Sequence, residues 1–538
     1  MTVLRAIPLI MLLTLLAACE PAPSNDGTPT AVSDIPTSVE EDVETPAAEP
    51  KEPATEPDPA ETEETEAMDP SQIDRSPIDD EEAQSLMFNL LEGSRSEAEA
   101  ALDRILAAND QRFVSVLIEM MRARQIGLIQ TLDATTIVNS LETLSGQSFG
   151  GDWGGWITWY GSTDLTPPPG FTSWKGRLLA GIDTYFGLFL QDKHPSNIRV
   201  EEIQWGGVVL DGIPALDNPK MLTAAEADYL EPWEPVFGIA INDDARAYPL
   251  RILDWHEMAN DVVGGVPVSL AYCTLCGAAI AYDGRSVDLE GNEVTYTFGS
   301  SGFLFRSNKL MYDRSTLTLW NQLTGEPVLG ELAAGDIRLN LLPVVLTTWA
   351  DWQTQHPDTV VVDIETGFNR VYVPGAAYGD YFANDERLFR DGLMFPVWQQ
   401  SDRLFNKDHV YALRLDDVPK AYPVTDLLAE QVVNDVVGET AVTLIAAGEI
   451  VAVDGTSQRV GPVTYTSGAE IRAFARDEHT FSPGANDFTV LDEDGRSWQV
   501  TEEALLGPDG ETLNRINGHL AYWFGWYAFY PETALYQP

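Results

Sequence analysis

The chain has 538 residues, of which 44% are hydrophobic and 14 are tryptophan. This is enough for about two or three domains with substantial cores, which excludes a small disulfide-stabilised scaffold. The formal net charge is −52. Nucleic acid is therefore not an expected partner, because phosphate binding needs clustered lysine and arginine.

The N-terminus has the pattern of a lipoprotein export signal. One positive charge at Arg5 precedes the apolar run 6–16, and the tetrapeptide 16–19 (LAAC) resembles a lipobox. The run is shorter than the roughly 20 residues needed to span a bilayer. We expect residues 1–18 to be a removed signal peptide and Cys19 to carry a lipid. That lipid would hold the protein to a bacterial membrane, facing the periplasm or the cell exterior.

Residues 19–78 have the composition of a disordered acidic tether. The segment is rich in proline, glutamate and threonine, and its basic residues are Lys51 and Arg75. Low hydrophobicity with charge of one sign cannot bury a core. We expect this tether to hold the folded part away from the membrane surface.

Residues 79–199 are predicted to form a helical domain. Apolar residues recur at helical spacing, as at Leu102, Ile105 and Leu106. The short helices resemble the helix pairs of a HEAT-type repeat, and a plain helical bundle is the alternative. A connector rich in tryptophan and glycine (150–159) follows. This domain is a possible docking surface for a protein partner.

From about residue 200 the chain is predicted to be mainly β. Short β-branched and aromatic runs alternate with Gly, Asn, Asp and Pro. Segment 236–250 resembles 410–424, and the motif NDVVG at 260–264 recurs at 434–438; both pairs are 174 residues apart. We expect two duplicated lobes, 200–405 and 406–538, the second a partial copy of the first. The predicted fold class is α+β, with a small all-α domain before the mainly β domain.

Two cysteines are the expected centre of the chemistry. Cys19 is assigned to the lipid, so Cys273 and Cys276 are the remaining thiols of an exported chain. They lie between two strand-like runs, where the turn of a hairpin aims both sulfurs at one point. The second lobe lacks both cysteines and has Glu430 in place of His256. Features present in one copy only are candidates for function.

The leading prediction is a site for copper or zinc. Two thiolates from Cys273 and Cys276, with the imidazole of His256, suit either metal. Met311 would favour cuprous ion, because soft sulfur ligands select it. His519, within an aromatic segment near the C-terminus, is a further candidate ligand. Whether the protein is an enzyme stays open.

Two alternatives remain beside metal binding. Cys273 and Cys276 can form the redox-active disulfide of a thiol–disulfide oxidoreductase, or an inert structural one. The protein can also be a surface interaction protein whose cysteines only brace a hairpin. A change of His256 separates the first two predictions, since a metal would be lost and thiol exchange would largely tolerate it.

A series of ordered motifs runs from about residue 200 to the C-terminus. They are 211–220 (DGIPALDNPK), 246–257 (RAYPLRILDWHE), 272–277 (YCTLCG), 298–302 (FGSSG), 310–314 (LMYDR), 319–326 (LWNQLTGE) and 523–526 (WFGW). Together they resemble the bacterial family numbered 3179 among the domains of unknown function. The family usually has Cys-Pro-x-Cys-Gly, whereas this chain has Thr274 in place of proline. The resemblance implies an exported or membrane-linked protein, with no established activity to carry over.

Overall fold

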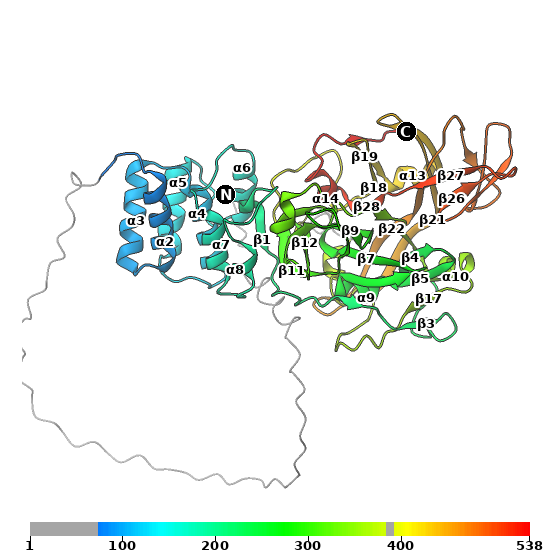
Figure 1. The fold of residues 1–538 in the computed structure, drawn as a ribbon, viewed down its shortest axis with the longest axis horizontal. Coiled ribbons are helices and arrows are strands. Elements are labelled where there is room, and N and C mark those ends of the chain that lie inside the picture. Colours follow the sequence, from blue (N-terminus) through cyan, green and yellow to red (C-terminus); the bar gives the residue numbers. More distant parts are fainter. Residues whose placement is uncertain (1–73, 384–391) are drawn as a thin grey trace, which may run out of the picture.

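The computed structural model describes residues 74–383 and 392–538. The predicted signal peptide, Cys19 and the tether up to residue 73 lie outside the described residues. A helical N-terminal region is followed by a region made mainly of sheets (Figure 1). No helix in the described ranges is long and apolar enough to cross a membrane.

The helical region is built from short, well-capped helices. Asp79 caps the first helix by accepting a hydrogen bond from the Glu82 amide, and Ser94 with Glu97 forms a capping box at the second. The first two helices pack against each other, as do the next two. The helices are α2 (Asp80–Glu92), α3 (Arg95–Ala108), α4 (Phe113–Gln125), α5 (Ala134–Ser145), α6 (Trp153–Gly161), α7 (Phe171–Leu179) and α8 (Phe186–Phe189).

The tryptophan- and glycine-rich connector is helical and packs against the β region. Trp156 in α6 is fully buried. The ring of Tyr160 meets that of Trp398 edge-on, at 5.6 Å between centroids. Large aromatic side chains bury much apolar area, so this stretch joins the two regions.

A buried lysine also ties the helical region to the start of the β region. The Lys175 side chain is 0% exposed, and its Nζ lies 2.7 Å from Glu119 Oε1. It also donates to the carbonyl oxygen of Val200, at 3.2 Å, and to that of Ile203. These carbonyls belong to η1 (Val200–Glu202) and to the first strand.

The first β lobe contains three five-stranded sheets and a two-stranded ribbon. The sheet orders are β1-β11-β12-β13-β14, β15-β8-β7-β6-β2 and β16-β4-β5-β17-β3, and the ribbon is β10-β9. The strands are β1 (Ile203–Trp205), β2 (Leu216–Asp217), β3 (Met221–Thr223), β4 (Pro235–Ile241), β5 (Asp244–Pro249), β6 (Met258–Val263), β7 (Val266–Cys273), β8 (Ala278–Asp283), β9 (Arg285–Val287), β10 (Glu293–Thr295), β11 (Phe298–Phe305), β12 (Asn308–Asp313), β13 (Leu319–Asn321), β14 (Pro327–Leu329), β15 (Leu341–Leu342), β16 (Val345–Thr348) and β17 (Val360–Val362). The helical segments of this lobe are α9 (Leu250–His256), η2 (Thr274–Cys276), η3 (Glu331–Ala334), α10 (Trp349–Gln355) and α11 (Gly379–Phe382).

The C-terminal lobe contains a four-stranded and an eight-stranded sheet. Their orders are β28-β18-β19-β29 and β20-β21-β22-β27-β26-β25-β24-β23. The strands are β18 (His409–Leu415), β19 (Val418–Pro423), β20 (Val432–Val437), β21 (Thr440–Ser457), β22 (Gly461–Ala475), β23 (Ser482–Pro483), β24 (Thr489–Leu491), β25 (Ser497–Val500), β26 (Ala504–Leu506), β27 (Thr512–Ile516), β28 (His519–Tyr522) and β29 (Ala534–Leu535), with helices α13 (Val424–Glu430) and α14 (Trp523–Tyr527).

Several local interactions occur in both lobes at the same spacing of 174 residues. The strand pairs β4–β5 and β18–β19 each lead into a short helix, α9 and α13, and then into a second antiparallel pair. Matching hydrogen bonds are Tyr248 to Asp261 (2.7 Å) and Tyr422 to Asp435 (2.9 Å), then Trp352 to Thr359 (2.8 Å) and Trp526 to Thr533 (2.9 Å).

Candidate functional site

The two cysteines lie in the turn of the β7–β8 hairpin. Cys273 ends β7, η2 forms the turn, and Ala278 pairs with Cys273 at the start of β8. Gly277 closes the turn at φ +59°, a left-handed conformation that glycine adopts without strain. Both thiols are free, with Cys273 2% and Cys276 0% exposed. The structure confirms the predicted hairpin turn and places both sulfurs inside the protein.

Cys276 is held as a neutral thiol. Its Sγ donates to the carbonyl oxygen of Ser307, at 3.3 Å, and accepts a hydrogen bond from Asn308 Nδ2 at 3.4 Å. Burial raises the pKa of Cys276 well above its ordinary value, and the hydrogen bond and charge of Cys273 add to this effect. The two sulfurs are therefore direct neighbours in a reduced pair.

A buried ion pair lies beside the turn. Lys309 Nζ on β12 is 3.5 Å from Glu257 Oε2 and donates to the Glu257 carbonyl oxygen at 3.0 Å. Thr274 Oγ1, inside the turn, donates to Glu257 Oε1 at 2.8 Å. Burial lowers the pKa of Lys309, and negative charge on Glu257 and on Cys273 opposes that effect. The ammonium group of Lys309 is thus close enough to Cys273 for an electrostatic interaction.

The C-terminal lobe closes the site. A Cβ added at Gly525, in α14, would lie 3.1 Å from Cys276 Cβ, and one added at Gly277 would lie 3.2 Å from the Tyr522 ring of β28. Tyr381 in α11 donates its hydroxyl hydrogen to the carbonyl oxygen of Leu275 at 2.9 Å. The CxxC turn is therefore enclosed between the two lobes, and a bulky partner cannot reach it directly.

Replacement of Gly525 by alanine should loosen this closure. The new methyl group would press on Cys276, and overpacking of a tight core typically costs about 1–3 kcal/mol. We expect a lower urea midpoint and faster reaction of the two thiols with a soluble thiol reagent. Gly151→Ala is the matched control, since a Cβ there meets only a Gln125 side-chain nitrogen, at 3.9 Å. Equal thiol protection in both variants would contradict this close packing.

His256 faces away from the cysteines. Its Nδ1 lies 2.7 Å from the carbonyl oxygen of Pro214, and its Nε2 lies 2.6 Å from the Tyr372 hydroxyl. A carbonyl only accepts, so Nδ1 carries the proton and Nε2 accepts from Tyr372. Burial lowers the pKa of His256 to about 4. Both ring nitrogens are thus used in holding α9 to the surrounding loops, and neither is directed at a thiol.

The other two predicted ligands lie on two different strands. Met311 on β12 is fully buried in the same apolar cluster as Cys273 and Cys276. His519 on β28 has its Nδ1 3.0 Å from the Leu520 carbonyl oxygen, and burial lowers its pKa to about 4. Across residues 74–383 and 392–538, no three His, Cys, Asp or Glu side chains are arranged to hold a metal ion.

The sequence analysis missed the two charged residues nearest the thiols. Glu257 directly follows His256 in the motif 246–257, and Lys309 directly precedes the motif 310–314. Both residues have polar and charged neighbours in the sequence, so their burial could not be predicted from local composition. The pairing of the two joins a helix end to a distant strand, which no local pattern reveals.

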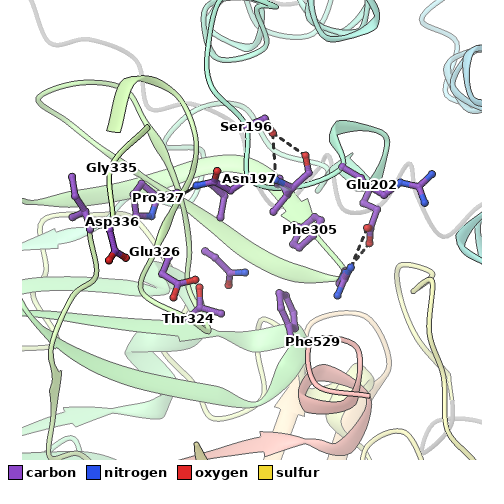
Figure 2. A pocket seen from close by; sticks show the side chains of 16 residues that line it. Ser196, Asn197, Glu202, Phe305, Thr324, Glu326, Pro327, Gly335, Asp336 and Phe529 are labelled. Atoms are coloured by element: carbon purple, nitrogen blue, oxygen red, sulfur yellow. Dashed lines mark hydrogen bonds and ion pairs between the residues drawn. The ribbon is translucent and has the colours of Figure 1, made fainter. Parts of the chain in front are cut away.

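A separate open pocket of about 800 Å³ lies where the helical region meets the first lobe (Figure 2). Its wall includes the ion pair of Arg306 with Glu202, at 2.8 Å, and the rings of Phe305 and Phe529. Arg306 also stacks over both rings. The Arg306–Glu202 pair and the two rings are thus already partnered within the protein, and neither cysteine lines the pocket.

The profile of a family described as "Protein of unknown function (DUF3179)" matches residues 210–533. No curated protein and no solved structure matches the chain.

Proposed function

Because the chain belongs to the DUF3179 family, whose function is unknown, we propose a function from its own geometry: Cys273 and Cys276 form a redox-active dithiol. The pair cycles between two thiols and one disulfide. The observation that supports this most directly is the contact between two free, buried sulfurs within a single turn. Such a pair needs no further ligand to react.

The charges around the turn favour this chemistry. A dithiol and a disulfide are both neutral, and Lys309 with Glu257 is a neutral pair. Cycling therefore changes no buried net charge, whereas an unpaired buried charge is strongly unfavourable. The oxidant must be small, since both sulfurs are almost fully buried. With a small disulfide as oxidant, the two thiols lose two protons and two electrons, and the disulfide takes them up and becomes two thiols.

The cellular setting is part of the same proposal. The lipobox-like segment and the acidic tether support an exported protein anchored through Cys19. Disulfides form and persist in such compartments. The second lobe is a partial duplicate that lacks the thiols and serves as a scaffold over the first lobe. The shared hydrogen bonds at a spacing of 174 residues support this interpretation.

A soft metal is the second candidate. Met311 lies in the same buried cluster as Cys273 and Cys276, and two thiolates with a thioether suit cuprous ion. Zinc needs four ligands in a structural site, and the described ranges offer no such set. Copper is therefore the metal to test, with His256 left out of the ligand set.

Reversible disulfide formation in the full chain tests the proposal. We expect peptide mapping to find a Cys273–Cys276 disulfide after treatment with a small disulfide, and its loss after reduction. Cys273→Ser and Cys276→Ser should each abolish it, while Cys19→Ser should not. Thiols that stay reduced until the protein unfolds would refute a redox role. Near-stoichiometric copper, lost in the double serine variant, would favour the second candidate.

A further inference from the structure

A second cavity, of about 270 Å³, lies between the two lobes, and neither cysteine lines it. The first lobe contributes residues between 323 and 341, and the second contributes residues of β18, β28 and α14. This volume is that of about nine water molecules. It lies just below the range of about 300–1,000 Å³ that is common for drug-sized ligands. The cavity therefore has room for a small metabolite.

His519 on β28 has an unused nitrogen at the wall of this cavity. The residue is 7% exposed. Its Nδ1 lies 3.0 Å from the carbonyl oxygen of Leu520, and a carbonyl only accepts, so Nδ1 carries the proton and Nε2 is an acceptor. No residue in the described ranges donates to Nε2. Burial lowers the pKa of His519 to about 4, so the ring is neutral at neutral pH.

Two further wall residues have a polar atom without a partner. Thr324 Oγ1 and Asn517 Oδ1 are buried, and neither has a hydrogen bond within the part of the chain that the structure describes. Buried polar groups without partners are unfavourable and are rare in folded proteins. Three polar atoms without partners around one cavity favour a polar occupant.

Charged groups of both signs stand at the same cavity. Arg338 comes from the first lobe, and Arg414, Asp416 and Asp417 come from the second. Arg338 pairs with Glu326 and Arg414 with Asp417. A guanidinium group has five N–H donors, so other donors of both arginines remain for a ligand. Arginine binds a carboxylate through two parallel hydrogen bonds, and the aspartates attract a cation. The two signs together suit a zwitterion.

The rest of the wall is apolar. Leu323 and Leu339 are buried, and so is the ring of Trp526. The Tyr530 ring lies beside Trp526, at 4.4 Å between centroids. Apolar groups gain free energy when such a surface removes them from water, so the wall favours a ligand with a hydrocarbon portion.

The first lobe lacks the polar groups of this cavity. The residues 174 positions before Arg414 and His519 are Ala240 and Val345. Both pairs of residues occupy matching registers in their strand pairs. The duplicated scaffold therefore does not need a guanidinium or an imidazole group at these positions, which makes Arg414 and His519 candidates for binding.

We propose that this cavity binds a free α-amino acid with a hydrocarbon side chain. The carboxylate of the ligand pairs with Arg338 and Arg414. Its ammonium group donates to His519 Nε2, and the two aspartates that follow β18 balance the charge. Its side chain lies against the buried leucines and the Trp526 ring. This binding site goes beyond the proposed redox function and does not depend on it.

Calorimetric titration of the full chain with L-leucine tests the proposal. We expect saturable binding with one site. Isocaproate lacks the amino group of leucine, and isoamylamine lacks its carboxylate. Each should bind at least about 10-fold more weakly, because it loses hydrogen bonds to charged groups. Equal affinity for leucine and either analogue, or no saturable binding of leucine in the millimolar range, would overturn the proposal.

Two variants that copy the first lobe locate the binding site. Arg414→Ala and His519→Val should each weaken leucine binding at least about 10-fold. Arg95→Ala is the matched control, since it removes an arginine from an exposed pair in the helical region, and should bind as wild type does. If His519→Val folds poorly, Arg414→Ala decides the test, because its side chain is 29% exposed. Wild-type affinity in the folded variants would overturn the assignment of this cavity.

Discussion

Replacement of Arg472 by methionine should lower the free energy of unfolding by about 3–5 kcal/mol. Arg472 on β22 is 2% exposed and lies at the centre of a buried charge network. Its guanidinium group pairs with Glu470 and Glu502 and donates to Gln355 Oε1 at 2.9 Å. Loss of the cation leaves Glu470 without an ion-pair partner among the residues that the structure describes. Urea unfolding of the full chain measures the effect.

The matched control removes an arginine from an exposed pair. Arg414 lies 2.6 Å from Asp417, whose side chain is 81% exposed. Surface pairs of this kind contribute about 0–1 kcal/mol, so Arg414→Met should shift the midpoint only slightly. Similar shifts in the two variants would mean that the buried network adds nothing beyond surface pairing.

The pH dependence gives a second check on the network. Burial raises the pKa of Glu502, but the charges of Arg472 and Arg515 outweigh it and lower the pKa to about 2 from an ordinary 4.5. A lowered folded-state pKa stabilises the fold above the ordinary value and loses that stabilisation as the pH falls. The difference between wild type and Arg472→Met should therefore shrink between pH 4.5 and 2.

The local structure around the cysteines follows from local patterns. The strand-like runs on either side of Cys273-x-x-Cys276 predict a hairpin with the cysteines in its turn. Both strands occur, as β7 and β8. The change from a helical N-terminal region to a mainly sheet C-terminal region is likewise visible in composition alone.

The direction of side chains is what the sequence does not reveal. His256 ends α9 and Glu257 follows it in a left-handed conformation, so the sequence does not decide which of the two side chains faces the turn. In the structure, His256 hydrogen-bonds to the carbonyl oxygen of Pro214, and the Glu257 carboxylate accepts a hydrogen bond from Thr274. The closure of the turn by Gly525 depends on the packing of two lobes, for which no local pattern exists.

Replacement of Lys309 by methionine should also lower the free energy of unfolding by about 3–5 kcal/mol. The Glu257 side chain is 8% exposed, and this change leaves it buried without its cation. Methionine keeps most of the apolar volume of lysine, so the loss reflects charge rather than a cavity. Urea unfolding of the full chain measures it, and wild-type stability in this variant would contradict a functional ion pair at the turn.

The double variant Glu257→Gln, Lys309→Met separates structure from chemistry. Glutamine keeps an oxygen for the Thr274 hydrogen bond. The variant has neither charge of the Lys309–Glu257 pair, so most of the stability lost in Lys309→Met should return. A coupling between the two changes is then visible in the double-mutant cycle. If the ion pair serves the dithiol, the stable double variant will still oxidise more slowly than wild type. Recovery of both stability and oxidation rate would instead restrict Lys309 and Glu257 to holding the fold.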